Sequence, residues 1–460
     1  MPDRSNYKKE LAAKQQRVES LLEGLVSSVE PIIGSDNPYH YRNKVHAAVG
    51  VSKGRVIAGT YEPGTHRIIE GGGSELENEA ASAVIADIVA IANKYHMSVY
   101  NEKTGQGLLR RILIRTADGT GQMLVVLVLG DYMFPGKKNF VKTLVSRHPE
   151  ITSIVININK RTDSMILGDK SETVYGSGII VDTLLGKKFS ISAESFYQVN
   201  RRQAEKLYSK AYEYAVLDKE SRVLDAYCGT GTIGICASDL CGSVVGVELN
   251  PQAVSDAKKN VQMNKASNVK IIKADATEYM NSNASRGKFD VVILDPPREG
   301  TTPEFIKACG RISPSRIAYV SCNPETLARD LKLFDAEGYK AVKACPVDMF
   351  SGTEHVETVV LLSKGIDISA GKLRVEISVE DMDLSAAHGN ASYNKIKKHV
   401  YEKTGLQVSN LNIAQIKRKY GIIERENYNL PKSENSKQPN CTPEKEKAIV
   451  AALQYFKMIG

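Results

Sequence analysis

Residues 223–234 are VLDAYCGTGTIG. The apolar start is typical of a buried strand, and Gly229, Gly231 and Gly234 follow it in the spacing G-x-G-x-x-G. Glycines let a backbone turn tightly from a strand into a helix and come close to a ligand. Taken alone, this turn suits a dinucleotide, a nucleoside cofactor or simple packing.

Strand and helix patterns alternate outward from this turn. The predicted strands are Arg222–Asp225, Ser243–Glu248, Val269–Ala274, Phe289–Leu294 and Arg316–Ser321, with His355–Leu362 as one more. Helical segments separate them, which predicts the α/β class with a doubly wound, Rossmann-like parallel sheet. The ligand site of such a sheet lies at the carboxyl ends of its strands, where the strand order reverses.

The patterns divide the chain into three parts. An N-terminal helix over residues 5–30 and an α+β domain are predicted within 1–185, and the catalytic domain within 186–364. Residues 365–460 form a small, mostly helical appendage. It has a strand-like run at 372–379 and helices around 391–403, 411–420 and 442–458.

Composition narrows the class of protein. The formal charge of +8 suits a polyanionic partner, although many basic proteins bind no nucleic acid. The longest apolar run, Met123–Leu129, is too short for a membrane helix, and the charged N-terminus has no apolar signal core, so we expect a cytoplasmic protein. None of the seven cysteines forms a C-x-x-C pair, so we expect reduced thiols and no metal site.

Two carboxylates stand at the ends of two successive predicted strands, Glu248 and Asp275. A carboxylate at the first position can accept both ribose hydroxyls of a nucleoside, and one at the second can meet an adenine amino group. Two such positions without a second glycine motif favour S-adenosylmethionine over NAD. The alternative is that both are ordinary polar residues at strand ends.

A third carboxylate, Asp295, begins the segment DPPR (295–298) after an apolar strand. The two prolines stiffen the backbone and hold Asp295 at the switch point, where it can bond a flat polar substrate. D-P-P is common among methyltransferases of planar amine-bearing bases, many of which have an aromatic residue next. Arg298 stands there instead, which argues against methylation of an exocyclic amine.

Cys322 and Glu357 are the candidate catalytic residues. Cys322 lies just past a strand end, where a helix start lowers the pKa of a thiol nucleophile; the alternative is a small buried side chain. Glu357 stands among valines, where low-dielectric surroundings raise the pKa of a carboxylate and suit it to act as a base. The alternative is a solvent-exposed edge-strand residue.

These parts suggest one reaction, methylation of uracil at C5. This carbon is too weak a nucleophile to attack a methyl sulfonium unless a thiolate first adds to C6. The proton on C5 must then leave so that the thiolate is expelled. One thiolate, one base and one methyl donor are therefore needed, and each has a candidate here.

Five segments, in order and spacing, resemble the RNA uracil-C5 methyltransferase family: SFYQVN (195–200), LDAYCGTGTIGI (224–235), DPPREG (295–300), SCNPETLARDL (321–331) and HVETVVLL (355–362). Weaker similarity reaches HYRNK (40–44). The resemblance implies Cys322 as nucleophile and Glu357 as proton acceptor. It also implies S-adenosylmethionine contacts from Gln198, Tyr227, Thr232, Glu248, Asp275 and Asp295.

The sequence departs from the family in three places. Many ribosomal members begin with a small β-barrel that binds RNA, which residues 1–35 cannot supply. Several carry a four-cysteine iron–sulfur cluster in the first half, but the first cysteine here is Cys228, so we expect no cluster. Residues 365–460 extend beyond the usual end of the family.

The substrate is predicted to be RNA. A domain organisation without a β-barrel or an iron–sulfur cluster resembles the tRNA-specific branch of the family. The motifs GTGTIG (229–234) and HVETVVLL look more like the ribosomal branch, which favours 23S rRNA. A uridine of the tRNA T-loop is the alternative. Another nucleobase methyltransferase and a non-catalytic RNA-binding module are the competing functions. We expect a monomer.

Basic residues outside the motifs are candidates for phosphate contacts. In the first half these are Arg42, Lys44, Arg110 and Arg111, each of which is as readily explained as part of a solvated face. The appendage is a second candidate RNA grip, and a protein–protein or stabilising role is the alternative. Its basic residues on predicted helices are Lys395, Lys397, Lys398, Lys417, Arg418 and Lys419.

Overall fold

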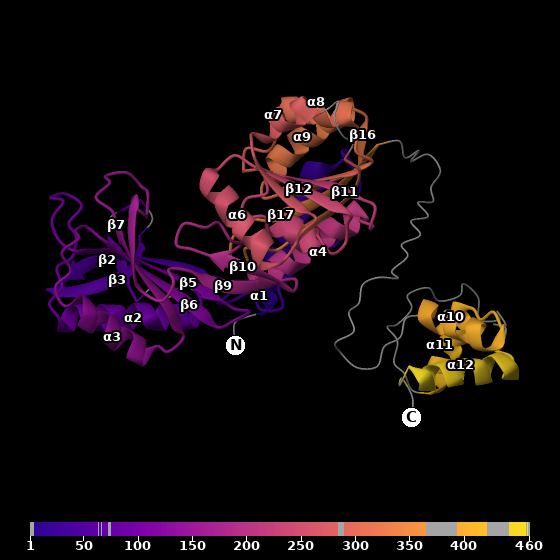
Figure 1. The fold of residues 1–460 in the computed structure, drawn as a ribbon, viewed down its shortest axis with the longest axis horizontal. Helices are drawn as coiled ribbons and strands as arrows, with labels where there is room; N and C mark the ends of the chain where they lie inside the picture. The colour runs from indigo at the N-terminus through magenta and orange to yellow at the C-terminus, as the bar shows by residue number, and fades with distance from the viewer. Residues whose placement is uncertain are drawn as a thin grey trace. The chain divides into compact units, whose positions relative to one another are not determined.

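The computed structural model describes residues 4–62, 64–65, 67–71, 75–283, 289–364, 393–420, 441–456 and 458. The chain divides into two compact units, Met1–Leu373 and Arg374–Gly460 (Figure 1). The predicted start of the appendage at residue 365 and the strand-like run 372–379 lie outside the described residues.

An eight-stranded sheet carries the glycine turn. Its strands lie in the order β1 (Val26–Val29), β16 (Tyr339–Val347), β17 (Glu357–Lys364), β15 (Arg316–Ser321), β14 (Val291–Leu294), β11 (Arg222–Ala226), β12 (Ser243–Glu248) and β13 (Val269–Lys273). Neighbours from β15 to β13 run parallel, whereas β17 is antiparallel to both β15 and β16. The Rossmann-like α/β prediction is confirmed, and the order reverses between β11 and β14, where such sheets bind ligands.

Helices cover both faces of this sheet. They are α4 (Arg201–Ala215), α5 (Thr232–Ala237), α6 (Pro251–Met263), α7 (Ala276–Asn283), α8 (Pro303–Ile312) and α9 (Pro324–Ala336). Asn250, Thr302 and Asn323 cap α6, α8 and α9, each followed by a proline in the first turn. A polar cap that accepts a free N–H, followed by proline, is a strong helix start, which explains why these helices begin directly after the strand-end loops.

The first residues of the chain differ from the single helix predicted over 5–30. They form α1 (Arg4–Leu22) and then β1, which pairs in parallel with β16 at the edge of the eight-stranded sheet. Val18 and Leu22 are buried in the same core as α8 and α9. Without β1, the backbone N–H and C=O groups on the outer side of β16 would be unpaired at the sheet edge. This segment therefore packs on the catalytic sheet.

A second sheet lies in the N-terminal part of the same unit. Its strands lie in the order β4 (Ile68–Glu70), β3 (Arg55–Tyr61), β2 (Lys44–Ser52), β5 (Leu109–Ala117), β6 (Gln122–Leu129), β7 (Ile151–Ile158) and β8 (Lys170–Tyr175). Helices α2 (Glu79–Lys94) and α3 (Lys137–Arg147) cover one face (Figure 1). The alternate residues Val45, Ala47 and Val49 are buried in that core. Strands β9 (Ile180–Leu184) and β10 (Lys187–Ile191) form a hairpin that the patterns did not predict. The hairpin packs in the hydrophobic core that also contains residues of α4 and β11.

The second unit contains α10 (Tyr393–Thr404), α11 (Asn410–Lys419) and α12 (Pro443–Tyr455), as the periodicity predicted. They enclose their own apolar core around Ile396, Ile413 and Leu453. Across the described parts of both units, no helix has the length and hydropathy that a membrane crossing requires.

Candidate active site

The glycine turn forms as the sequence predicts. After β11, Tyr227, Gly229 and Gly231 take left-handed backbone angles, with φ of +63°, +54° and +81°. Helix α5 starts directly afterwards. A Cβ on Gly234 would lie 2.8 Å from an Asp225 carboxylate oxygen, which accepts a hydrogen bond from the Gly234 N–H. Glycine at this position therefore lets α5 pack closely on β11.

A cavity of about 850 Å³ opens beyond this turn at the carboxyl ends of the strands. It is lined by all the predicted site residues except Asp275, namely Gln198, Tyr227, Thr232, Glu248, Asp295, Cys322 and Glu357. The Asp275 carboxylate instead accepts a hydrogen bond of 3.0 Å from the Glu278 N–H in the first turn of α7. The cavity thus brings together motifs that span more than half of the catalytic domain.

Cys322 and Glu357 meet through strand pairing. The register of β15 with antiparallel β17 ends with Ser321 paired to Thr358. Cys322 follows Ser321 and Glu357 precedes Thr358, so the two side chains come close enough for the Glu357 charge to act on the Cys322 thiol. Asp295 follows β14, the parallel neighbour of β15. A thiol and two carboxyl groups from three adjacent strands therefore face one cavity.

Burial shapes the acid–base properties of these groups. Withdrawal from water and the neighbouring carboxyls of Glu357 and Asp295 raise the pKa of Cys322 to about 11. Burial, followed by the charge of Asp295, raises the pKa of Glu357, and burial raises that of Asp295. Within the described residues no protein group donates a hydrogen bond to either carboxyl. Carboxyls that are buried, unpartnered and turned to a cavity mark a functional site.

Arg298 partly offsets this negative charge. Its guanidinium lowers the pKa of Cys322 and Glu357, against the larger opposite effect of burial. Its side chain lies 3.3 Å from His355 Nδ1, and its backbone carbonyl accepts from the Asn323 amide and the Thr326 hydroxyl. These contacts thus hold Arg298, the residue after the two prolines, in the lining of the cavity.

The glycine-turn end of the cavity suits a nucleoside. One oxygen of the Glu248 carboxylate accepts from the Gly229 N–H at 3.0 Å and the other from the Asn250 N–H at 2.7 Å. Each carboxylate oxygen can accept a further bond, which matches a pair of ribose hydroxyls. A Cβ on Gly229 would meet nothing within 4 Å, so this backbone stands open to a ligand. The donor set and the space fit S-adenosylmethionine.

The SFYQVN segment forms another wall and is held from the N-terminal sheet. The Asn43 side chain donates to the Gln198 carbonyl at 2.9 Å, and its backbone N–H donates to the Val199 carbonyl at 2.9 Å. The Arg115 guanidinium donates to the carbonyls of Ser192 and Ser195. The weak HYRNK similarity therefore corresponds to a contact that shapes the cavity.

The patterns missed several cavity residues, among them Phe196, Tyr208 and Phe350. The Tyr208 hydroxyl lies 3.2 Å from the Thr232 hydroxyl, yet Tyr208 comes from the middle of α4. Phe350 lies in a loop between β16 and β17. Phe196 stands inside a quoted motif, which is the only sequence signal among the three.

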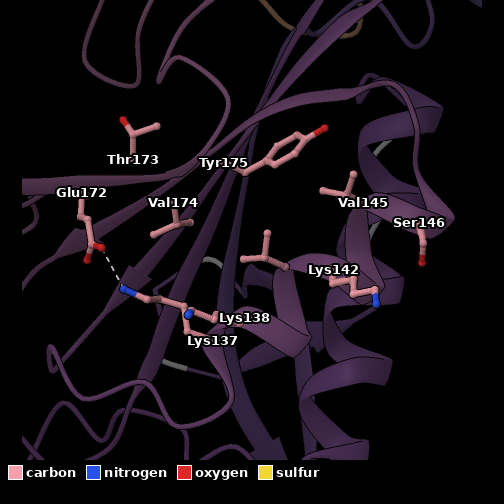
Figure 2. A pocket seen from close by; sticks show the side chains of 10 residues that line it. Lys137, Lys138, Lys142, Val145, Ser146, Glu172, Thr173, Val174 and Tyr175 are labelled. Atoms are coloured by element: carbon pink, nitrogen blue, oxygen red, sulfur yellow. Dashed lines mark hydrogen bonds and ion pairs between the residues drawn. The ribbon is translucent and has the colours of Figure 1, made fainter.

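A second hollow of about 740 Å³ lies between α3 and β8 (Figure 2). Lys137, Lys138 and Lys142 surround an apolar floor, and Lys137 pairs with Glu172 at 2.8 Å. It contains no cysteine and no glycine turn, so the chemistry belongs to the first cavity.

The chain is similar to known proteins. Residues 157–365 match the family described as tRNA (uracil-5-)-methyltransferase. An uncharacterized RNA methyltransferase of Clostridium tetani is 40% identical over 78% of this chain and 79% of its own length. One of Bacillus cereus is 38% identical over 78% and 79%. The solved tRNA (uracil-54, C5)-methyltransferase of Pyrococcus abyssi, in complex with S-adenosyl-L-homocysteine, is 28% identical, with a TM-score of 0.66 over 77% of this chain and 83% of its own.

This chain thus contains a glycine turn, strand-end carboxylates and a thiol at one cavity. It matches RNA methyltransferases over most of its own length and most of theirs. The protein belongs to the S-adenosylmethionine-dependent RNA uracil-C5 methyltransferase family.

Proposed function

We propose that the protein methylates C5 of a uridine in 23S rRNA, with Cys322 as nucleophile and Glu357 as base. The observation that carries this proposal is that Cys322, Glu357 and Asp295 line one cavity, with Cys322 and Glu357 next to the last pair of the β15–β17 ladder. A reaction on 23S rRNA takes place where ribosomes are made, so the proposal makes the protein an rRNA-processing enzyme of the cytoplasm.

The covalent steps use groups on these three strands. The Cys322 thiolate forms a bond to C6, and the electron pair of the C5–C6 double bond moves onto C5 and the adjoining carbonyl. Bound S-adenosylmethionine would supply the methyl group that the C5 electron pair attacks, and its methyl–sulfur bond would break to leave the neutral thioether. Glu357 then accepts the C5 proton, the electron pair left behind restores the double bond, and the C6–sulfur bond breaks to return the thiolate.

The remaining cavity residues bind and orient. We assign Gln198, Tyr227, Thr232 and Glu248 to the cofactor, with Glu248 accepting ribose hydroxyls. Asp275 stands outside the cavity lining, although its charge acts on the cavity residue Tyr227, and we keep it as a candidate contact for the adenine amino group. Asp295, whose raised pKa favours a protonated carboxyl, is suited to donate to a carbonyl of the uracil or to bind the cofactor.

The choice of 23S rRNA rests on the motifs GTGTIG and HVETVVLL. The Pyrococcus abyssi neighbour is a tRNA (uracil-54, C5)-methyltransferase, which favours the alternative, a tRNA uridine. Both RNAs would require the target base to lie in a loop or to be flipped out of its stack.

The test offers 5-fluorouracil-substituted 23S rRNA and tRNA separately, with S-adenosylmethionine. Fluorine on C5 cannot leave as a proton, so the adduct through Cys322 should persist and shift the protein on a denaturing gel. The expected result is a shifted band with 23S rRNA, absent for Cys322→Ala. A band with tRNA alone would overturn the rRNA assignment. Methyl transfer to unmodified RNA without any trapped band would overturn the covalent mechanism.

A further inference from the structure

One face of the N-terminal sheet carries a row of cationic side chains. Register places Lys44 of β2 opposite Arg115 of β5, and Ala48 opposite Arg111. Side chains two residues apart on a strand share a face, so Lys44, His46, Arg111 and Arg115 lie together. Their face is the one opposite α2 and α3, because the alternate residues Val45 and Ala47 pack in the core with α2.

Arg42 precedes β2 and lies close enough for its charge to act on His46, so it extends the row. In the described part of the chain no carboxylate forms an ion pair with Arg42, Lys44, His46 or Arg111. All four are half-buried. The Arg42 Nε, His46 Nδ1 and Arg111 Nε atoms are buried and lack a hydrogen-bond partner among the described residues. Leaving a buried donor unpaired is unfavourable, so the free protein holds these groups ready for an outside partner.

The electrostatics of the row agree with this geometry. Burial and the charge of Arg115 lower the pKa of Lys44 to about 8. Burial, then Lys44, Arg115, Arg111 and Arg42, lower the pKa of His46 to about 4. The lowered pKa values of Lys44 and His46 thus agree with cations that no carboxylate neutralises, and an anion placed there would relieve the repulsion.

The row leads to the active-site cavity. Arg115, at one end, donates to the carbonyls of Ser192 and Ser195, next to the cavity residue Phe196. Asn43, which directly precedes Lys44, donates to the carbonyl of the cavity residue Gln198. A strand of RNA whose uridine occupies the cavity would therefore continue over this face.

We propose that Arg42, Lys44, His46 and Arg111 form a phosphate-binding row for the RNA backbone next to the target uridine. The occupant is RNA because the row offers three cations, Arg42, Lys44 and Arg111, with the uncharged His46 among them and no carboxylate, which suits a repeating polyanion. The inference rests on the RNA methyltransferase family and not on the choice of 23S rRNA.

Two other basic sites lack these features. Arg110, on the same strand, is 3% exposed, and its guanidinium pairs with Glu102 at 2.6 Å and donates to the Asn159 carbonyl at 2.9 Å. It is a structural residue, and the earlier expectation of a phosphate contact is wrong for it. The lysines of the hollow in Figure 2 share no lining residue with the active-site cavity, and one of them, Lys137, is paired with Glu172. Lys138 and Lys142 therefore serve as a control of equal charge.

The experiment compares Lys44→Met/Arg111→Gln with Lys138→Gln/Lys142→Gln in the full-length protein. The probe is a fluorescein-labelled single-stranded RNA of mixed sequence, titrated at several salt concentrations. Loss of two phosphate contacts should weaken binding on the order of tenfold and lower the slope of log affinity against log salt by about 0.7 per contact. The control should keep both values, and cofactor affinity should be unchanged in each protein.

Thermal unfolding separates binding from a structural role. Lys44→Met removes a half-buried cation that Arg115 repels and keeps a side chain of similar length. The melting temperature of this variant should therefore rise while its RNA affinity falls. A lower melting temperature with unchanged RNA affinity would overturn the proposal, as would an equal loss in the control. Because the probe requires no methyl transfer, failure of the 5-fluorouracil trap would leave this result standing, and the reverse also holds.

Discussion

At the scale of single residues, the environment of Cys322 is opposite to the one that the sequence suggested. The start of α9 two residues later favours a thiolate, whereas burial and two neighbouring carboxyls raise its pKa. The raised pKa of Glu357, by contrast, agrees with the low-dielectric surroundings expected from its valine neighbours. Both groups must be deprotonated to perform their proposed roles.

The first prediction concerns the base. Glu357→Gln should slow turnover by about 10²–10⁴-fold, since the C5 proton then has no acceptor. The covalent complex with unmodified RNA should consequently accumulate and be visible on a denaturing gel. Glu354→Gln, at an exposed position in the loop just before β17, is the matched control and should turn over normally. Full activity in Glu357→Gln would remove this residue from the mechanism.

The second prediction concerns pH. With a Cys322 pKa of about 11, the thiolate fraction should rise about tenfold per unit from pH 6 to 9. The rate of iodoacetamide labelling of Cys322, followed by peptide mass spectrometry, should rise in parallel. Glu357→Gln removes a negative neighbour, so it should lower the Cys322 pKa and speed labelling at pH 8. An unchanged rate would contradict the electrostatic coupling.

At the scale of elements, α1 holds the loop between β16 and β17 that contributes Phe350 to the cavity. The Asp348 carboxylate, 0% exposed, accepts from Tyr7, Lys14 and Ser351, each at 2.6 Å. Lys14 also donates to the Phe350 carbonyl at 3.1 Å. The N-terminal helix thus fixes a wall of the active site.

The third prediction follows from this contact. Lys14→Ala would leave Asp348 as an unpaired buried charge and should destabilise the catalytic unit by about 3–5 kcal/mol. Urea unfolding measures the change, with Lys9→Ala, an exposed residue of the same helix, as control. A loss below about 1 kcal/mol, typical of exposed ion pairs, would show that the pair contributes little.

Elements with strong local periodicity followed the sequence, and those defined by partners did not. The helices of the catalytic domain start at polar caps followed by proline, a signal contained in adjacent residues. Strand β1 and the β9–β10 hairpin were missed because short strands are stabilised by the sheets and cores they join. Strand β8 is exposed along most of its length, so it lacks the alternation that marks a half-buried strand.

At the scale of the whole molecule, the second unit has a hydrophobic core of its own. Its basic residues are less available than their number suggested. Lys417 is 6% exposed, and Lys419 pairs with Glu446. The proposed RNA grip of this unit therefore rests on the remaining cations of its helices.

The fourth prediction tests that grip. Deletion of residues 366–460 should raise the KM for RNA severalfold and leave kcat and cofactor affinity unchanged, since the described residues that line the cavity all lie within 194–357. Steady-state methylation kinetics provide the measurement, and the melting temperature of the shortened chain controls for folding. An unchanged KM would assign the appendage to another role.

The sequence by itself determined the glycine turn, the strand-end carboxylates and the family. These depend on residues adjacent in the chain, and the carboxyl ends of parallel strands always meet at one edge of a sheet. Only the tertiary structure decided that antiparallel β17 places Glu357 next to Cys322, and that Arg110 is buried while Arg111 remains unpaired on the opposite face. Pairing direction and burial depend on contacts between distant segments, which no local pattern specifies.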